Sequence, residues 1–155
     1  MIAFADLGSV NAFFYILANF MSDFQRRILI TEDNRVLGDV LRFNLQRSGF
    51  DVTIALDGSE AIDLLCVQTF DLLITDYQMP NVNGAELCQH IRQNRSLDEM
   101  VIIMCSAKGM ELNREQLRED WNIATLVLKP FSIREIVAIV NDLLAPTEDT
   151  SPACS

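Results

Sequence analysis

The sequence has few of the residues that build zinc sites, disulfide scaffolds or nucleic-acid-binding surfaces. It contains one histidine, His90, and four cysteines that occur singly with no CxxC pair, which argues against a Cys/His zinc site. Cys66, Cys88 and Cys105 stand inside apolar segments, and we interpret them as reduced core residues of a cytoplasmic protein. The 12 Lys and Arg are outnumbered by 22 Asp and Glu, so the net charge of −10 argues against nucleic acid as a direct partner.

No Lys or Arg precedes Arg26, so the apolar first 21 residues lack the positive region of a signal peptide. Polar residues interrupt this stretch, and its longest apolar run, 12–18, is far shorter than the about 20 residues of a transmembrane helix. We first interpret residues 1–24 as an extension without chemical importance, with Met21 as an alternative start. An added amphipathic helix that covers the domain or contacts a partner is the second interpretation, and a membrane anchor the third.

From Gln25 onward, short apolar runs alternate with segments whose apolar residues recur at helical spacing. We predict strands at 27–31, 52–55, 70–75, 101–105 and 124–128, and helices at 36–45, 61–67, 85–91, 110–120 and 133–144. Near-continuous apolar strands that alternate with helices predict an α/β domain, with a parallel sheet covered on both faces. We expect this domain to span residues 25–145, followed by a disordered tail at 146–155.

Polar residues follow the strands of this predicted sheet, at the edge where open parallel sheets bind their ligands. Glu32 and Asp33 follow the first strand, Asp76 the third, Ser106 the fourth and Lys129 the fifth. Clustered carboxylates repel one another unless a cation lies among them, and their oxygens suit Mg²⁺. A metal, a hydroxyl and an ammonium group together can stabilise a phosphoryl group, and a carboxylate can act as its nucleophile.

Each of these residues also has a purely structural interpretation. Asp33 or Asn34 could cap the first helix, and Asp57, which follows the second strand, stands in a turn. Asp76 precedes a loop with Pro80 and could itself be a turn residue, and a structural hydroxyl is the default for a serine. The combination of these side chains at one sheet edge favours a functional site.

The same segments resemble the receiver domain of two-component response regulators, of the stand-alone type, across about residues 25–145. The resemblance implies a flavodoxin-like (βα)5 fold, which is a doubly wound sheet of five parallel strands. It is carried, in order, by ILITEDN at 28–34, LDGSEA at 56–61, DLLITDYQMP at 71–80 with Gly84, Ser106-Ala107, and Lys129-Pro130-Phe131. Five pieces in order, each at an expected strand end, are a specific signal.

The resemblance assigns roles to particular residues. Asp76 would accept a phosphoryl group, Ser106 would hydrogen-bond that group, and Lys129 would pair with Asp76 and then with the phosphate. The implied magnesium ligands are Glu32, Asp33, Asp76 and the backbone carbonyl of Gln78. The peptide bond between Lys129 and Pro130 is expected to be cis.

The resemblance also implies partners. A histidine kinase or histidine phosphotransfer protein would supply the phosphoryl group, and a downstream protein would read it in the cytoplasm. The protein would be no enzyme beyond its own magnesium-dependent phosphorylation and dephosphorylation. We expect no direct contact with nucleic acid or with a membrane. A dimer that forms on phosphorylation is compatible with the resemblance.

The sequence departs from the family at Leu126, where receivers commonly carry Tyr or Phe. The alternative function is therefore a phosphate-independent pseudo-receiver that works as an interaction module. Gln78 and Lys108 stand at positions that tune the lifetime of the phosphate in this family, and their lack of an acid leads us to expect slow self-hydrolysis. Motifs of other enzyme classes, such as GxxxxGK[ST] or GxGxxG after the first strand, are missing.

Overall fold

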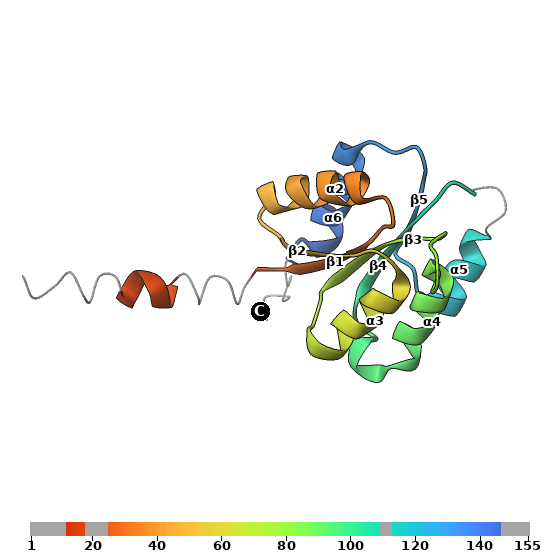
Figure 1. Cartoon of the computed structure of the whole chain (residues 1–155), viewed down its shortest axis with the longest axis horizontal. Coiled ribbons are helices and arrows are strands. Elements are labelled where there is room, and N and C mark those ends of the chain that lie inside the picture. Colours follow the sequence, from red (N-terminus) through yellow and green to blue (C-terminus); the bar gives the residue numbers. More distant parts are fainter. Residues whose placement is uncertain (1–11, 18–24, 109–112, 147–155) are drawn as a thin grey trace, which may run out of the picture.

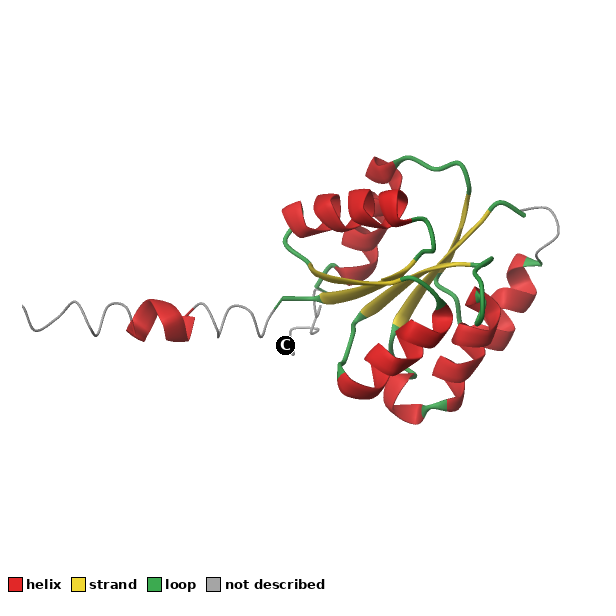
Figure 2. Cartoon of the chain, viewed as in Figure 1, coloured by secondary structure: helices red, strands yellow, loops and turns green. Residues whose placement is uncertain are grey.

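The fold is a five-stranded parallel sheet with helices on both faces (Figures 1 and 2), seen in a computed structural model that describes residues 12–17, 25–108 and 113–146. The strand order is β2-β1-β3-β4-β5, and every neighbouring pair is parallel. This arrangement confirms the predicted flavodoxin-like fold class. The strands are β1 (Arg27–Thr31), β2 (Asp51–Ala55), β3 (Leu72–Asp76), β4 (Val101–Ser106) and β5 (Thr125–Leu128).

The helices form two layers around the sheet, with α2 and α6 on one face and α3, α4 and α5 on the other (Figure 1). Their bounds are α2 (Arg35–Arg47), α3 (Gly58–Val67), α4 (Gly84–Gln93), the 3-10 turn η1 (Arg95–Leu97), α5 (Arg114–Trp121) and α6 (Ile133–Leu144). Five of these helices follow the five strands in turn. The chain therefore repeats one strand-and-helix unit, as the sequence pattern predicts.

Side chains of the central strands alternate between two apolar clusters, one on each face of the sheet. In β3, Leu73 packs with α3, α4 and α5, whereas Leu72 and Ile74 pack with α2 and α6. All five residues of β3 are buried, as are four of the five residues of β1. Burial of each Leu or Ile side chain contributes about 1.5–3 kcal/mol, so these strands form a stable base for the residues at their ends.

The predicted start of the third strand is wrong. The strand begins at Leu72 rather than residue 70, and the Asp71 carboxylate just before it accepts the Arg27 backbone N–H at 2.7 Å and pairs with Arg26. The fourth main helix, α5, begins at Arg114, where the Asn113 side chain caps its first backbone N–H groups. The predicted start at residue 110 lies outside the described residues.

The cysteine prediction holds for two positions and is wrong for the third. Cys88 and Cys105 are buried, and burial raises the pKa of each thiol to about 12, which makes both unreactive. Cys66 is exposed, because the helical period of α3 turns Leu65 into the core and leaves Cys66 and Val67 on the outer face.

Residues 12–17 form a short helix on the N-terminal side of β1 (Figure 1). The rest of the predicted extension lies outside the described residues, as does the predicted tail apart from Pro146. Among the helices that the structure describes, none is both long and apolar enough to cross a lipid bilayer.

Candidate functional site

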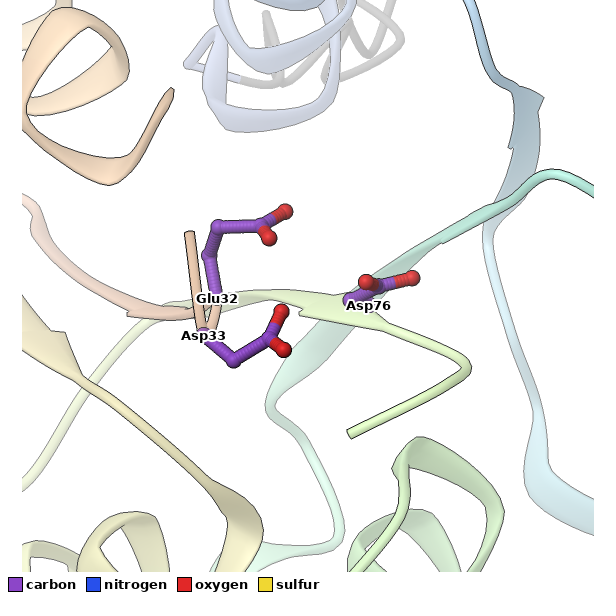
Figure 3. Close-up of side chains that lie close together, drawn as sticks. All are labelled: Glu32, Asp33 and Asp76. Atoms are coloured by element: carbon purple, nitrogen blue, oxygen red, sulfur yellow. The ribbon is translucent and has the colours of Figure 1, made fainter. Parts of the chain in front are cut away.

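Three carboxylates meet where β1 and β3 end (Figure 3). Glu32 and Asp33 follow β1, and Asp76 is the last residue of β3. The register of the two strands pairs Thr31 with Thr75, so Glu32 and Asp76 emerge side by side. One oxygen from each of the three carboxylates lies within 4.8 Å of the others. Glu32 and Asp76 are buried and Asp33 is exposed, so the cluster opens to solvent on the Asp33 side.

Lys129 joins two of these acids. Its Nζ donates to Glu32 Oε2 and to Asp76 Oδ2, both at 3.0 Å. Burial alone would lower the pKa of Lys129, but the hydrogen bonds and charges of the two carboxylates outweigh burial and raise it. Burial raises the pKa of Glu32, although Lys129 opposes that shift. The site therefore keeps its ammonium group protonated and holds a buried carboxyl group that binds protons more tightly than usual.

Ser106 ends β4 beside Asp76, because Asp76 pairs with Cys105 in the register of β3 and β4. It is fully buried, and its hydroxyl accepts the backbone N–H of Lys108 at 3.0 Å. Its carbonyl accepts the backbone N–H of Lys129 at 2.9 Å. The strand ends thus bring Ser106 and Lys129, the hydroxyl and the ammonium group of the predicted set, to the same edge as the acids.

The helix that follows β1 is capped by Asn34. The Asn34 side chain accepts the backbone N–H groups of Val36 and Leu37, and its own N–H donates to Glu32 Oε1 at 3.1 Å. Capping therefore falls to Asn34, and the Asp33 side chain is left for the acidic cluster. This settles the choice between the two capping candidates.

Gln78 lies in the loop between β3 and α4, next to the acids. Its backbone N–H donates to Asp76 Oδ1 at 3.4 Å, and its side chain is exposed. The loop borders an open pocket of about 450 Å³, lined by Asp33, Tyr77, Gln78, Met79, Pro80 and Asn83. An approaching group can reach the exposed side of the cluster through this pocket.

Two glycines, Gly58 and Gly84, hold this loop in place. A Cβ atom at Gly84 would meet the backbone carbonyl of Asp76, and one at Gly58 would lie 2.5 Å from the carbonyl oxygen of Val82. Close backbone approach therefore requires glycine at both positions. The sequence marks the two glycines as parts of a turn and a loop, but it does not show which backbone each of them faces.

Asp57 is a structural residue outside the acidic cluster. It caps α3, accepting the Glu60 backbone N–H at 2.9 Å, and it also accepts Ser59 Oγ and Asn81 Nδ2. The hydrogen bonds from Ser59, Glu60 and Asn81 lower its pKa to about 2. Asp57 thus fastens the start of α3 to the loop that carries Gln78.

The bond between Lys129 and Pro130 is cis, as expected. His90 is exposed on α4 and Trp121 is half-buried at the end of α5, so neither lies in the site. Leu126 is half-buried in β5 and lines a groove with residues of α5.

The donor set fits a small divalent cation. Three carboxylates and one ammonium group leave the cluster with a formal charge of −2. The Glu32 and Asp33 carboxylates point toward Asp76 (Figure 3), and the exposed Asp33 leaves one side of the cluster open, which suits Mg²⁺ because this ion keeps several of its water ligands.

The chain is similar in sequence and structure to receiver domains and response regulators. Residues 28–141 match the family model "Response regulator receiver domain". The response regulator TrrA of Thermotoga maritima, solved in complex with Mg²⁺-BeF, is 30% identical with a TM-score of 0.66, over 77% of this chain and 100% of that one. The receiver domain of the Francisella response regulator 1452 is 28% identical with a TM-score of 0.68, over 77% of this chain and 96% of that one.

A putative response regulator from Chloroflexus aurantiacus is 27% identical with a TM-score of 0.68, over 78% of this chain and 98% of that one. In each comparison the aligned region spans nearly the whole of the solved chain. The family model extends from the second residue of β1 into the last turn of α6, so it covers the whole sheet apart from Arg27. The chain therefore belongs to the response regulator receiver domain family.

Proposed function

We propose that this receiver accepts a phosphoryl group on Asp76 from a histidine kinase or a histidine phosphotransfer protein, in a reaction that depends on Mg²⁺. The observation that carries the proposal is the shared contact of Lys129 with Asp76 and Glu32, beside the exposed carboxylate of Asp33. The proposed magnesium ligands are Glu32, Asp33, Asp76 and the backbone carbonyl of Gln78. When bound, the metal would offset the negative charge of the incoming phosphoryl oxygens.

The proposed transfer uses the side chains in distinct roles. An Asp76 carboxylate oxygen attacks phosphorus, and an O–P bond forms while the N–P bond to the donor imidazole breaks. The imidazole nitrogen keeps the electron pair of that bond and takes a proton from solvent. The Lys129 ammonium group moves from the carboxylate to the new phosphoryl oxygens, and the Ser106 hydroxyl donates a hydrogen bond to one of them.

The output proposed here is a change in protein contacts in the cytoplasm. A phosphoryl group adds charge at the end of β3 and favours the conformation that binds it best, so a downstream partner would bind one state more tightly. We propose slow self-hydrolysis, because Gln78 and Lys108 offer no carboxylate to orient an attacking water. A half-life as short as those of the fastest receivers would contradict this part of the proposal.

The test is phosphorylation by acetyl phosphate with Mg²⁺, followed by intact mass. The expected result is a gain of one phosphoryl group, about 80 Da, that is absent from Asp76→Asn and from protein treated with EDTA. A chain that neither gains this mass nor binds beryllofluoride would contradict the proposal.

One observation favours a second candidate, a phosphate-independent pseudo-receiver. Leu126 lines the groove beside α5 with an aliphatic side chain, so β5 offers no aromatic ring at this position. A partner that binds wild-type protein and Asp76→Asn equally well, with or without acetyl phosphate, would establish this alternative.

A further inference from the structure

In the described part of the chain, two groups of neighbouring apolar side chains are exposed to solvent. One is the helix at residues 12–17, called here the N-terminal helix, in which all six side chains are exposed. Phe13, Phe14, Tyr15 and Ile16 are each more than 60% exposed. A helix that is apolar on all sides requires a covering surface, and one of six residues is too short to be stable alone in water.

The second surface runs along α2. Val36, Val40 and Phe43 are 74%, 40% and 58% exposed, and they follow one another at intervals of four and three residues. This spacing places them in one stripe, called here the α2 stripe, of the kind that packs against another helix. The Arg47 guanidinium lies over the Phe43 ring at 5.7 Å and extends the stripe by one turn.

The chain enters the domain at the end of α2. The Gln25 side chain donates to the Gly49 carbonyl at 2.9 Å, and the Arg26 carbonyl accepts the Asp51 backbone N–H at 3.0 Å. Gly49 follows Ser48, which is the residue that caps the carboxyl end of α2. The extension therefore starts beside the last turn of the helix that carries the α2 stripe.

The distances allow contact. The seven residues from 18 to 24 can span up to about 25 Å when extended. Phe43 lies about 8 Å and Val36 about 18 Å from Ser48 along the helix axis, at 1.5 Å per residue. A tether this short gives a local concentration on the order of millimolar, which favours contact within one molecule over contact between two.

Charge favours the same contact. In a chain of net charge −10, α2 carries Arg35, Arg42 and Arg47 against the one acid Asp39. Residues 1–24 carry the two acids Asp6 and Asp23 and neither Lys nor Arg. The extension is thus apolar with a few acids, and α2 is apolar along one stripe with basic flanks.

We propose that the N-terminal helix packs along the α2 stripe of its own molecule. Phe13, Phe14 and Ile16 cover Val40 and Phe43, and residues 18–24 form the connection back to Gln25. This contact would bury the exposed aromatic side chains and stabilise the helix that carries them. The contact does not depend on phosphorylation.

Disulfide cross-linking in the full chain tests this proposal. Ile16→Cys is combined with Val40→Cys in a background of Cys66→Ser and Cys154→Ser, and the buried Cys88 and Cys105 stay in place. The matched control combines Ile16→Cys with Val67→Cys, which is 77% exposed on α3, across the sheet. Val67 also lies near the start of the domain, since the neighbouring Gln68 accepts the Arg27 guanidinium at 2.7 Å.

We expect the 16–40 pair to form a monomeric disulfide at least about tenfold faster than the 16–67 pair. Adding Phe43→Ser should bring the 16–40 rate down to that of the control, because it removes the centre of the stripe. Equal rates for the two pairs, or a 16–40 rate insensitive to Phe43→Ser, would refute the contact.

Two further outcomes would also overturn the proposal. A cross-linked dimer whose yield rises with protein concentration would assign the α2 stripe to a second copy of the chain. Sedimentation of the full chain with phosphatidylcholine vesicles, without 16–40 cross-linking, would assign the N-terminal helix to a lipid surface.

Discussion

The Nζ of Lys129 lies 3.0 Å from Oδ2 of Asp76, so the residue after β5 reaches across the end of β4 to the end of β3. The same nitrogen contacts Glu32, which follows β1. The ammonium group therefore offsets part of the charge of two buried carboxylates, which stand at the ends of two separate strands. Any cation or phosphoryl group that enters the site must take over part of this role.

Asp33→Asn is expected to stabilise the metal-free protein and to abolish its response to magnesium. The substitution removes one of three mutually repelling carboxylates, so the free energy of unfolding without metal should rise by about 0.5 kcal/mol. Wild-type protein should gain stability as Mg²⁺ is added, because a ligand that binds only the folded state stabilises it. Urea denaturation with EDTA and with Mg²⁺ measures both effects.

The control for this prediction is Asp63→Asn, an acid on the exposed face of α3. It should keep the full magnesium response. If Asp33→Asn and wild-type protein gain equal stability from Mg²⁺, Asp33 is no magnesium ligand.

Gly84→Ala and Gly38→Ala are expected to change stability in opposite directions. An added Cβ at Gly84 meets the Asp76 carbonyl, so the loop must shift and stability should fall by about 1–3 kcal/mol. An added Cβ at Gly38, inside α2, meets Ile54 at an ordinary 3.6 Å, and alanine favours the helix by up to about 1 kcal/mol. Thermal unfolding of the two variants checks the signs, and a tolerated Gly84→Ala would contradict the close approach.

The Asp57 carboxylate should make folding depend on pH in acid. Its pKa is lowered to about 2 by bonds from Ser59, the Glu60 backbone and Asn81, so the folded state releases this proton more readily than the unfolded state. The stabilisation is fully present above the ordinary Asp pKa of about 3.9 and is lost as pH falls toward 2. Asp57→Asn should flatten this part of the stability curve, and an NMR titration of the Asp57 carboxyl group should give its low pKa directly.

Arg92→Lys is expected to destabilise the domain nearly as much as Arg92→Met. The Arg92 guanidinium donates to the backbone carbonyls of Leu97, Asp98, Met100, Trp121 and Asn122. One ammonium group cannot reach so many acceptors in a planar array, so both variants should lose about 1–3 kcal/mol. Denaturation in urea compares them, and full rescue by lysine would show that charge alone matters here.

The sequence was sufficient to predict the strands and the residues at their ends, for a physical reason. Buried parallel strands need continuous apolar runs, so Glu32, Asp76 and Lys129 mark the points where those runs stop. The parallel order then requires the polar residues to gather at one edge. The predicted gathering of Glu32, Asp33 and Asp76 is present in the structure.

Other features depend on contacts between distant segments and could not be predicted. No local pattern separates the capping Asn34 from the adjacent Asp33, since both residues suit a helix start. Gly84 is needed because the backbone at the start of α4 packs closely against the carbonyl of Asp76. Cys66 is exposed because the helical period of α3 places it on the outer face. Asp71, just before β3, pairs with Arg26, which is 45 residues away in the chain.

Asp76 stands at the end of a strand that is buried along its whole length. β3 is bonded to β1 on one side and to β4 on the other, and its side chains are packed into both apolar clusters. A strand confined in this way has no room to move when its terminal residue changes charge. We therefore expect any displacement that follows such a change to occur in the loops after β3 and β4, which lie at the surface, rather than in β3 itself.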